Sequence, residues 1–216
     1  DKSLGDLMNW LEKNGEAGNT VVIFMSDNGG LSSEPDGVTE DPTQNYPLNS
    51  GKGSAYEGGV REPMIVRWPG VVEAGKQIDK YLIIEDFYPT ILERQGIKGY
   101  KTVQPIDGVS FMPLLKGTGD PSVGRSLFWN CPNIWGNDGP GIGPTCSVRN
   151  GDWKLIYYYE TGRKELFNIP EDREHNDVAR QHPDIVKRLS GELGTYLRKV
   201  DGQRPSFKAT GKPVPW

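Results

Sequence analysis

The chain has 216 residues, of which 25% are charged and 35% are hydrophobic, and its formal net charge is −4 at neutral pH. This length suffices for one domain with its own core, or for one domain and a small appendage. Lys and Arg are scattered without a basic stripe, which argues against a nucleic-acid partner, and no apolar segment approaches the ~20 residues of a membrane-spanning helix.

The amino-terminal residues have helical spacing. Four apolar side chains recur at i, i+3, i+4 and i+7, namely Leu4, Leu7, Met8 and Leu11. This pattern predicts a helix over residues 1–15 whose apolar face packs in the core.

An apolar run over residues 20–25 follows, without alternation of polar and apolar side chains. It predicts a strand buried on both faces, as in a parallel α/β sheet, and ligands commonly bind where such strands end. Here the run leads into Asp27 and Asn28, whose oxygens suit Ca²⁺ or Mg²⁺, while Gly29 and Gly30 let the backbone turn away. Taken alone, the spacing of this segment favours a plain turn over a metal site.

The next elements are separated by turn-forming residues. Pro, Gly, Asp and Asn crowd residues 29–54, which predicts a long loop of the kind that borders functional sites. Residues 63–68 predict a second buried strand, and residues 85–95 predict a helix. A Gly and Pro cluster over residues 116–124 marks a domain boundary.

After that boundary, short strands alternate with turns. A small antiparallel sheet is predicted from residues 126–129, 145–149, 153–159 and 165–168, with Asn150-Gly151 as a tight hairpin turn. Residues 182–200 form an amphipathic helix that we expect to cover this sheet. The predicted domains are an α/β domain over 1–123, the sheet and helix over 124–204, and an irregular tail over 205–216.

Lys52 is the first candidate for chemistry. Gly51 and Gly53 flank it and allow close approach of the backbone, and its ammonium can neutralise an oxyanion as a point charge. A phosphate-binding P-loop is excluded, because Tyr46 stands where the first Gly is required and Gly53 where Ser or Thr is required. The alternative is a solvated loop lysine.

The blocks described so far, in their order along the chain, resemble the sulfatase family. Residues 19–30 are similar to its N-T-hydrophobic-S-D-N-G block, and residues 51–63 to its G-K-x-x-x-x-E-G-G-x-R-x-P block. Further similar blocks follow the family order at residues 1–15, 64–70, 86–92, 107–110, 148–156 and 165–168. The resemblance implies an α/β fold, with part of an alkaline-phosphatase-like mixed sheet flanked by helices and then a small antiparallel sheet with a packed helix.

The resemblance also implies a mechanism, the hydrolysis of a sulfate ester by a hydrated formylglycine with a divalent cation, Ca²⁺ or Mg²⁺. Asp27 and Asn28 match the family's metal ligands, and Lys52 matches a catalytic Lys that contacts a sulfate oxygen. The motif that is oxidised to formylglycine, C/S-x-P/A-x-R, does not occur at Cys131 or Cys146. The chain therefore looks like the carboxyl half of a sulfatase, which we expect to be inactive without an N-terminal half that carries the nucleophile.

Residues 128–136 are similar to the F-W-H-x-P-x-Y-W-G block of one bacterial group within the family, which suggests that they line one wall of the substrate pocket. Trp129 and Trp135 could stack on a sugar ring, although buried aromatic residues more often belong to a core. Asn130 replaces the family's His and cannot donate a proton as His would. The resemblance implies a sulfated small molecule or glycan as ligand and an exported protein, periplasmic or extracellular.

Several alternatives stay open. The chain could belong to a phosphoesterase of the same superfamily, or be a carbohydrate-binding half-domain without catalysis. Cys131 and Cys146 could form a disulfide in an exported protein or remain two small thiols. Glu57 and Arg61 have the i, i+4 spacing of a helical ion pair, and Arg149 is either a buried structural residue or a substrate contact.

Overall fold

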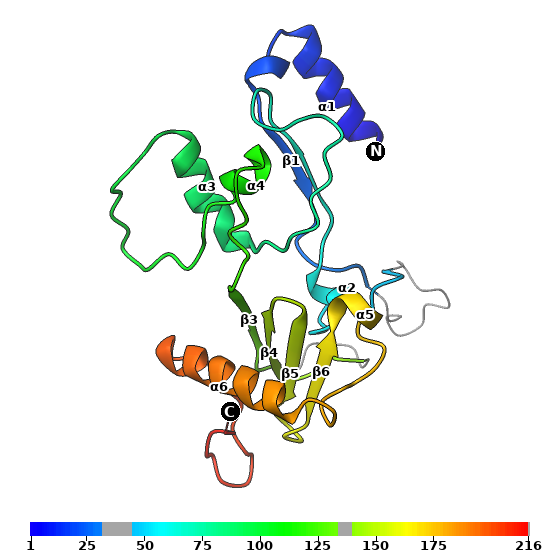
Figure 1. Ribbon diagram of the computed structural model, residues 1–216, viewed down its shortest axis with the longest axis vertical. Coiled ribbons are helices and arrows are strands. Elements are labelled where there is room, and N and C mark those ends of the chain that lie inside the picture. Colours follow the sequence, from blue (N-terminus) through cyan, green and yellow to red (C-terminus); the bar gives the residue numbers. More distant parts are fainter. Residues whose placement is uncertain (32–44, 134–139, 216) are drawn as a thin grey trace. The chain divides into compact units, whose positions relative to one another are not determined.

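A computed structural model describes residues 1–31, 45–133 and 140–215 (Figure 1). The chain divides into two compact units, of which the first comprises Asp1–Met25 and Pro63–Val123, and the second comprises Ser26–Glu62 and Gly124–Trp216. The second of the two segments that make up the second unit begins at Gly124, where the sequence predicts a domain boundary. However, residues 26–62 group with the carboxyl-terminal unit rather than with the predicted domain over 1–123.

The first unit is built from short elements: α1 (Lys2–Lys13), a 3-10 turn (Ala17–Asn19), β1 (Val22–Met25), β2 (Met64–Arg67), a second 3-10 turn (Ile84–Asp86), α3 (Phe87–Arg94) and α4 (Met112–Lys116). β1 and β2 form a two-stranded antiparallel sheet in which Phe24 pairs with Ile65. A core cluster forms around Trp68, Phe111 and Met112. Among the described residues, no helix is long and apolar enough to cross a membrane.

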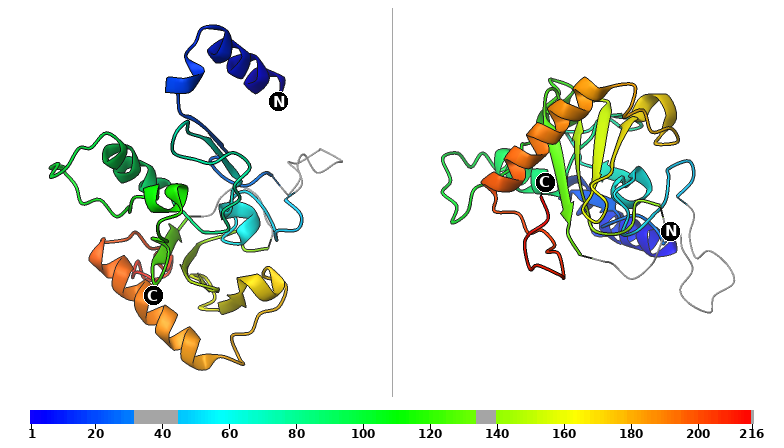
Figure 2. Two further views of the ribbon diagram at one scale, coloured as in Figure 1. Left: turned by 45° about the horizontal axis from the view of Figure 1, so that its top comes forward. Right: turned by 90° about the horizontal axis from the view of Figure 1, so that it is seen from below.

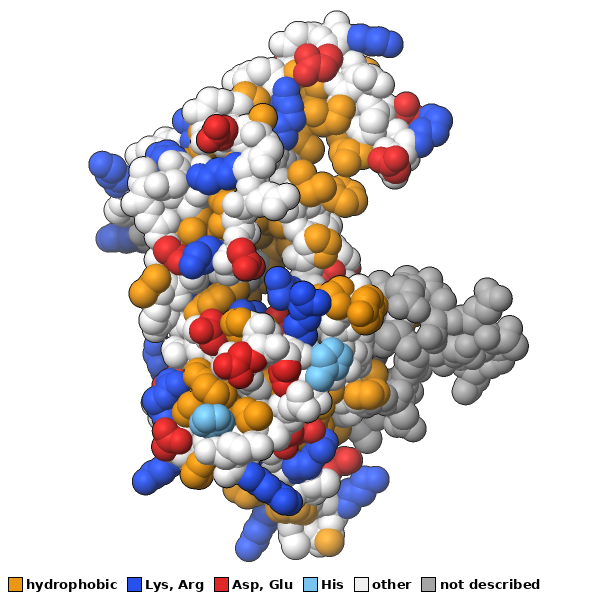
Figure 3. All heavy atoms as spheres, turned by 45° about the vertical axis from the view of Figure 1, so that its right-hand side comes forward, with side chains coloured by type: hydrophobic (Ala, Val, Ile, Leu, Met, Phe, Trp, Pro, Cys, Tyr) orange, Lys and Arg blue, Asp and Glu red, His pale blue; other side chains and the backbone are white. Residues whose placement is uncertain are grey.

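Two expectations for this unit are corrected. β1 is not a parallel strand covered on both faces: its described partner is antiparallel, and Phe24 and Ile65 are 55% and 64% exposed. In α1 only Leu11 is buried, while Leu7 is 48% exposed. An apolar pattern indicates which face can be buried, but the layer that buries it must come from elsewhere in the fold. Figure 3 shows hydrophobic side chains at the surface in the upper part of the view.

The second unit contains α2 (Glu57–Val60), β3 (Ser126–Cys131), β4 (Thr145–Asn150), β5 (Trp153–Tyr158), β6 (Lys164–Asn168), α5 (Ile169–Asp172) and α6 (Pro183–Lys199). The four strands form one antiparallel sheet in the order β3-β4-β5-β6, which confirms the predicted sheet. Asn150 pairs with Trp153, so the predicted hairpin turn closes over Gly151 and Asp152. Gly151 has a φ of +59°, in the left-handed region that Gly adopts without steric cost.

The two faces of this sheet pack against different partners (Figure 2). One face contributes Val148, Leu155 and Leu166 to a core with the apolar stripe of α6, as the sequence predicts. The opposite face packs Ile156 and Phe167 against the segment that precedes α2, where Ala55 and Tyr56 are buried. This second contact explains why residues 26–62 group with the sheet. Val214, in the irregular tail, also joins the core on the α6 side.

The two cysteines are free thiols, so no disulfide forms between them. Cys131 pairs across the strands with Thr145, and Cys146 pairs with Asn130. Because side chains alternate between the two faces of a sheet, a one-residue offset directs the two thiols to opposite faces.

Candidate functional site

Two segments of the second unit are joined by backbone hydrogen bonds. We call residues 27–30 the aspartate segment and residues 49–59 the lysine loop. The Gly29 N–H donates to the Gly59 carbonyl at 3.1 Å, and the Lys52 N–H donates to the Gly30 carbonyl at 3.0 Å. The predicted metal ligands Asp27 and Asn28 thus belong to a segment that is anchored to the loop that carries Lys52. Lys52 is partly buried there.

Three glycines make this close approach possible. A Cβ atom on Gly29 would lie 1.8 Å from the Gly58 carbonyl oxygen, and one on Gly58 would lie 2.3 Å from the Asn49 carbonyl oxygen. A Cβ on Gly59 would lie 2.2 Å from the Ser54 carbonyl oxygen. Each obstacle is backbone, which cannot rotate away as a side chain can. These glycines therefore serve close packing.

Asn45 joins the same two segments through its side chain, a role that the sequence did not reveal. Its Oδ1 accepts from the Gly30 N–H at 3.0 Å, and its Nδ2 donates to the Gly30 carbonyl at 2.8 Å and to the Ser50 carbonyl at 3.1 Å. An amide side chain carries both a donor and an acceptor, which this double role requires. The only local signal is an Asn that precedes a Tyr-Pro turn.

The surroundings of Asp27 fit a cation. Asp27 is exposed and Asn28 is partly buried. Burial, and secondarily the Asp27 charge, raise the pKa of Glu62, whose Oε1 is buried with no hydrogen-bond partner in the described part of the chain. A divalent cation would compensate the negative charges of Asp27 and Glu62. The described residues contain no group of three His, Cys, Asp or Glu side chains that could hold a metal, so Asp27 and Asn28 would be part of a larger ligand set.

A cluster of buried charged side chains contacts the lysine loop, which itself contributes Glu57. Lys154 Nζ, which is fully buried, lies 3.0 Å from Glu57 Oε1 and 2.9 Å from Glu174 Oε1. Arg149 Nη1 lies 3.0 Å from Glu57 Oε2, and Arg61 Nη1 lies 3.9 Å from the same oxygen. The predicted ion pair of Glu57 and Arg61 is confirmed. Arg149 is 15% exposed and pairs with Glu57, which favours its structural interpretation.

The two carboxyl groups of this cluster respond differently to their surroundings. Burial alone would raise the pKa of Glu57, but the charges of Lys154 and Arg149 outweigh it, so that the pKa is lowered. Burial raises the pKa of Glu174 to about 7, because Lys154 offsets it only in part and the Glu57 charge acts in the same direction as burial. Glu57 is therefore ionised at neutral pH, whereas Glu174 titrates near neutrality.

The predicted substrate residues are separated by the sheet. Trp129 pairs with Ser147 and so shares the face that bears Arg149 and Lys154, with Lys154 Nζ 6.0 Å from its ring centroid. Asn130 points to the opposite face, where its Oδ1 accepts from the Tyr159 hydroxyl at 2.8 Å and its Nδ2 donates to the Gln203 carbonyl at 2.7 Å. These bonds give Asn130 a structural role. The remaining predicted residue, Trp135, lies outside the described residues.

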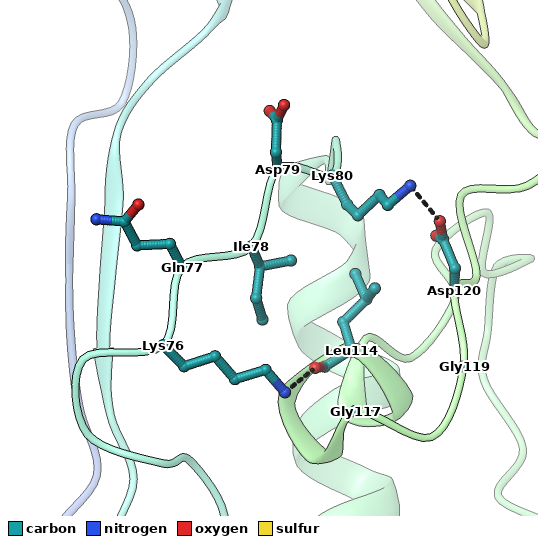
Figure 4. A pocket seen from close by; sticks show the side chains of 9 residues that line it. All are labelled: Lys76, Gln77, Ile78, Asp79, Lys80, Leu114, Gly117, Gly119 and Asp120. Atoms are coloured by element: carbon teal, nitrogen blue, oxygen red, sulfur yellow. Dashed lines mark hydrogen bonds and ion pairs between the residues drawn. The ribbon is translucent and has the colours of Figure 1, made fainter.

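A pocket of about 470 Å³ lies within the first unit (Figure 4). Its two lysines engage neighbouring groups: Lys80 Nζ lies 3.1 Å from Asp120, and Lys76 Nζ lies 3.5 Å from the Leu114 carbonyl oxygen. None of the residues singled out from sequence lines this pocket. Lys80 is thus paired with a carboxylate, whereas the partner of Lys76 is a neutral carbonyl oxygen.

Comparisons with known proteins agree on one family. The family description "Sulfatase" matches residues 1–97, and "N-sulphoglucosamine sulphohydrolase, C-terminal" matches residues 51–199. A protein named "Sulfatase" from Formosa agariphila is 31% identical over 235 residues, covering 100% of this chain and 41% of that protein. The chain thus spans about two fifths of the length of this relative.

Solved structures agree with this result. The structure of Ps i-CgsB in complex with k-i-k-neocarrahexaose has a TM-score of 0.76 and 29% identity, covering 95% of this chain and 42% of that one. BT4656 in complex with its substrate D-glucosamine-2-N,6-O-disulfate has a TM-score of 0.71 and 24% identity, over 94% and 39% of the two chains. The predicted α/β class, with the mixed architecture of the alkaline-phosphatase-like superfamily, is confirmed by this likeness.

Proposed function

The chain belongs to the sulfatase family, and on this premise we propose that it supplies the carboxyl-terminal share of the active site of a sulfuric ester hydrolase. The observation that carries the proposal is the connection between the aspartate segment and the lysine loop. The bonds from Gly29 to Gly59 and from Lys52 to Gly30 hold two hard oxygen ligands and an ammonium in one framework. Such a combination suits a substrate whose reacting group carries negative charge.

We assign Lys52 to the sulfate oxygens. Its ammonium would bind a sulfuryl oxygen of the ester and stabilise the charge that builds up there during transfer. The glycine contacts around it fix the backbone of the loop, so little reorganisation is required when the charge develops. Trp129 would contribute to the substrate side of this unit, because it lies on the same sheet face as Arg149 and Lys154.

We assign Asp27 and Asn28 to a divalent cation, Ca²⁺ in preference to Mg²⁺. A carboxylate and an amide carbonyl oxygen are among the ligands that Ca²⁺ accepts in its flexible coordination. Glu62 Oε1 is buried and has no hydrogen-bond partner among the described residues, which supports a nearby positive charge. When bound, the cation acts as a Lewis acid on the sulfate oxygens. Asp27 and Asn28 would hold it, and the bond that anchors Gly29 would keep them in place.

The nucleophile would be supplied by the part of the relatives that this chain does not span. Neither Cys131 nor Cys146 lies in a formylglycine motif, and burial raises the pKa of Cys146 to about 11. The partner of this chain would then be the N-terminal half of the same protein. The structure of Ps i-CgsB holds an oligosaccharide, which supports a carbohydrate as the substrate that carries the sulfate ester. We propose an exported protein on the family resemblance alone.

The test is sulfate release by the protein at its full natural length. We expect release from 4-nitrocatechol sulfate and from at least one member of a panel of sulfated disaccharides. Chelation should abolish the release, and Ca²⁺ should restore it. The 216-residue chain alone should release none. Metal-loaded protein that contains formylglycine, verified by mass spectrometry, but releases no sulfate would contradict the proposal.

The two alternatives predict other outcomes of the same experiment. A phosphoesterase would hydrolyse 4-nitrophenyl phosphate faster than the sulfate. A carbohydrate-binding half-domain would bind glycans equally well with and without chelator, whereas a metal-dependent site should lose its sulfated ligand when Ca²⁺ is removed.

A further inference from the structure

Glu174 contacts the lysine loop at two points, although it follows the loop by more than a hundred residues. Its side-chain Oε2 accepts from the Glu57 N–H, at the first residue of α2. Its backbone carbonyl accepts from Asn49 Nδ2 at 3.2 Å. The Asn49 carbonyl in turn accepts from the Gly58 N–H at 2.9 Å. Glu174 therefore restrains both ends of the loop, and Lys52 lies between them.

The backbone conformation of Glu174 costs free energy, because it lies in the left-handed region. Its φ is +68°, and Arg173 before it has a φ of +53°, so two consecutive residues with Cβ atoms adopt the left-handed region. Such residues persist only where surrounding contacts over-determine them, and they are concentrated at functional positions. Here the Glu174 N–H donates to Asp172 Oδ1 at 3.1 Å, and Lys154 holds the carboxylate at 2.9 Å. The contacts thus aim a fully buried side chain at the lysine loop.

We propose that Glu174, held by Lys154, is a positioning residue that fixes the lysine loop and thereby the place of Lys52 relative to Asp27 and Asn28. The effect on catalysis rests on the proposed function, whereas the restraint of the lysine loop by Glu174 does not. This restraint gives Lys154 and the turn after α5 a role in the reaction without any contact with substrate. The sheet provides Lys154, and the turn after α5 provides the carboxylate.

The charge of Glu174 gives this role a pH dependence with a definite sign. Lys154 faces the carboxylate from β5, Glu57 faces it from α2 together with its partners Arg149 and Arg61, and Asp172 lies beside it on α5. Burial raises the pKa of Glu174 from 4.5 to about 7 in the closed loop, and opening of the loop would hydrate the carboxyl group. The stabilisation of the closed loop by the Glu174 carboxyl group is therefore complete below 4.5, its pKa in the solvated state. It is lost as the pH rises to about 7, the pKa in the closed loop.

The experiment measures hydrogen–deuterium exchange of residues 49–60 in the protein at its full natural length, together with kcat and KM. Glu174→Ala removes the acceptor, Glu174→Gln retains an acceptor without charge, and Glu171→Ala is a matched control on the exposed side of α5. For Glu174→Ala we expect at least tenfold faster exchange in the lysine loop, unchanged exchange in β4 and β5, and at least tenfold lower kcat. At pH 4.5, where Glu174 is protonated in the closed loop, loop exchange in Glu174→Gln should stay within about threefold of wild type. Glu171→Ala should match wild type at every pH.

A pH series gives a second readout. After correction for the intrinsic exchange rate, opening of the wild-type loop should increase between about pH 4.5 and pH 7 and level off above, and Glu174→Gln should show no such rise. Unchanged loop exchange in Glu174→Ala, or equal acceleration in all segments, would overturn the proposal. If Glu174→Ala fails to fold, the comparison of wild type with Glu174→Gln decides alone. A loop effect in a protein without sulfatase activity would refute the proposed function and leave the positioning role standing.

Discussion

Asn45 and Gly30 exchange two hydrogen bonds, in which the side-chain amide accepts from the Gly30 N–H at 3.0 Å and donates to the Gly30 carbonyl at 2.8 Å. The amide thus satisfies both backbone groups of one residue, as a neighbouring strand would. Because Nδ2 also donates to the Ser50 carbonyl, a single side chain sets the spacing between the aspartate segment and the lysine loop.

Asn45→Asp tests this connection with almost no change in size. The aspartate places a second acceptor against the Gly30 and Ser50 carbonyls. The Ser50 carbonyl loses the Asn45 donor, and the Gly30 carbonyl keeps only the Lys52 N–H. We expect a loss of about 2–3 kcal/mol in the free energy of unfolding, from the lost hydrogen bonds and from repulsion between acceptors. Denaturant unfolding measures it. Asn133→Asp, on an exposed residue of the same type, is the control, and equal stability of the two variants would contradict the prediction.

Lys52→Ala should reduce kcat without affecting the fold. Removal of a group that stabilises charge in a transition state typically costs about 10²–10³ in kcat. Stability should change by less than about 0.5 kcal/mol, as for most changes away from the core. Lys98→Ala, in an exposed turn, provides the control, and a Lys52→Ala enzyme within threefold of wild-type kcat would exclude the assigned role.

Gly29→Ala should be among the most damaging changes of a single methyl group. The new Cβ would lie 1.8 Å from the Gly58 carbonyl oxygen, so that the aspartate segment must move away from the lysine loop. Overpacking of this kind costs on the order of 1–3 kcal/mol. Gly191→Ala is the opposite case: nothing lies within 4 Å of its Cβ position in α6, and it should gain about 1 kcal/mol in helix stability. Thermal unfolding distinguishes the two.

Asp27→Asn should weaken metal binding more than it weakens folding. The substitution keeps an oxygen at the site but removes the charge on which affinity for Ca²⁺ depends. In the protein at its full natural length, Ca²⁺ should raise the Tm of wild type, and the rise should be smaller at the same Ca²⁺ concentration in Asp27→Asn. Asp107→Asn, at an exposed turn, should behave like wild type. An identical Ca²⁺-dependent rise in both variants would remove Asp27 from the ligand set.

Thiol titration should distinguish the two cysteines. Burial raises the pKa of Cys146 to about 11, so at pH 8 it stays protonated and unreactive, whereas Cys131 is partly exposed. We expect one thiol to react with Ellman's reagent in the native 216-residue chain and two after denaturation without reductant. Absence of reactive thiol in the denatured chain would demonstrate a disulfide and contradict the geometry of β3 and β4.

The carboxyl-terminal sheet was predictable because its information is local. The short strand-forming runs of β4 and β5 and the Asn150-Gly151 turn between them predict strands and a hairpin without reference to distant residues. The helix α6 is predictable for the same reason, since its apolar stripe has the correct period. The family motifs likewise identify Asp27 and Lys52 as candidates through the order of the residues alone.

What the sequence could not indicate depends on contacts between distant residues. Lys154 lies in a strand where a Lys normally points to solvent, and it is fully buried only because Glu57 and Glu174 approach from elsewhere in the chain. The role of Asn45 depends on where Gly30 lies in space. The antiparallel pairing of β1 with β2 was not predicted, because the hydrophobicity of a strand does not reveal which neighbours it has.

The exposed pair of Phe24 and Ile65 has a practical consequence for work with this chain. In the described residues β1 and β2 pair only with each other, which leaves unpaired backbone groups along the outer edge of each strand. Hydrophobic strands with open edges are templates for association with further copies. The chain produced alone should therefore tend to aggregate as its concentration increases, and a charged residue in place of Ile65 should keep it in solution.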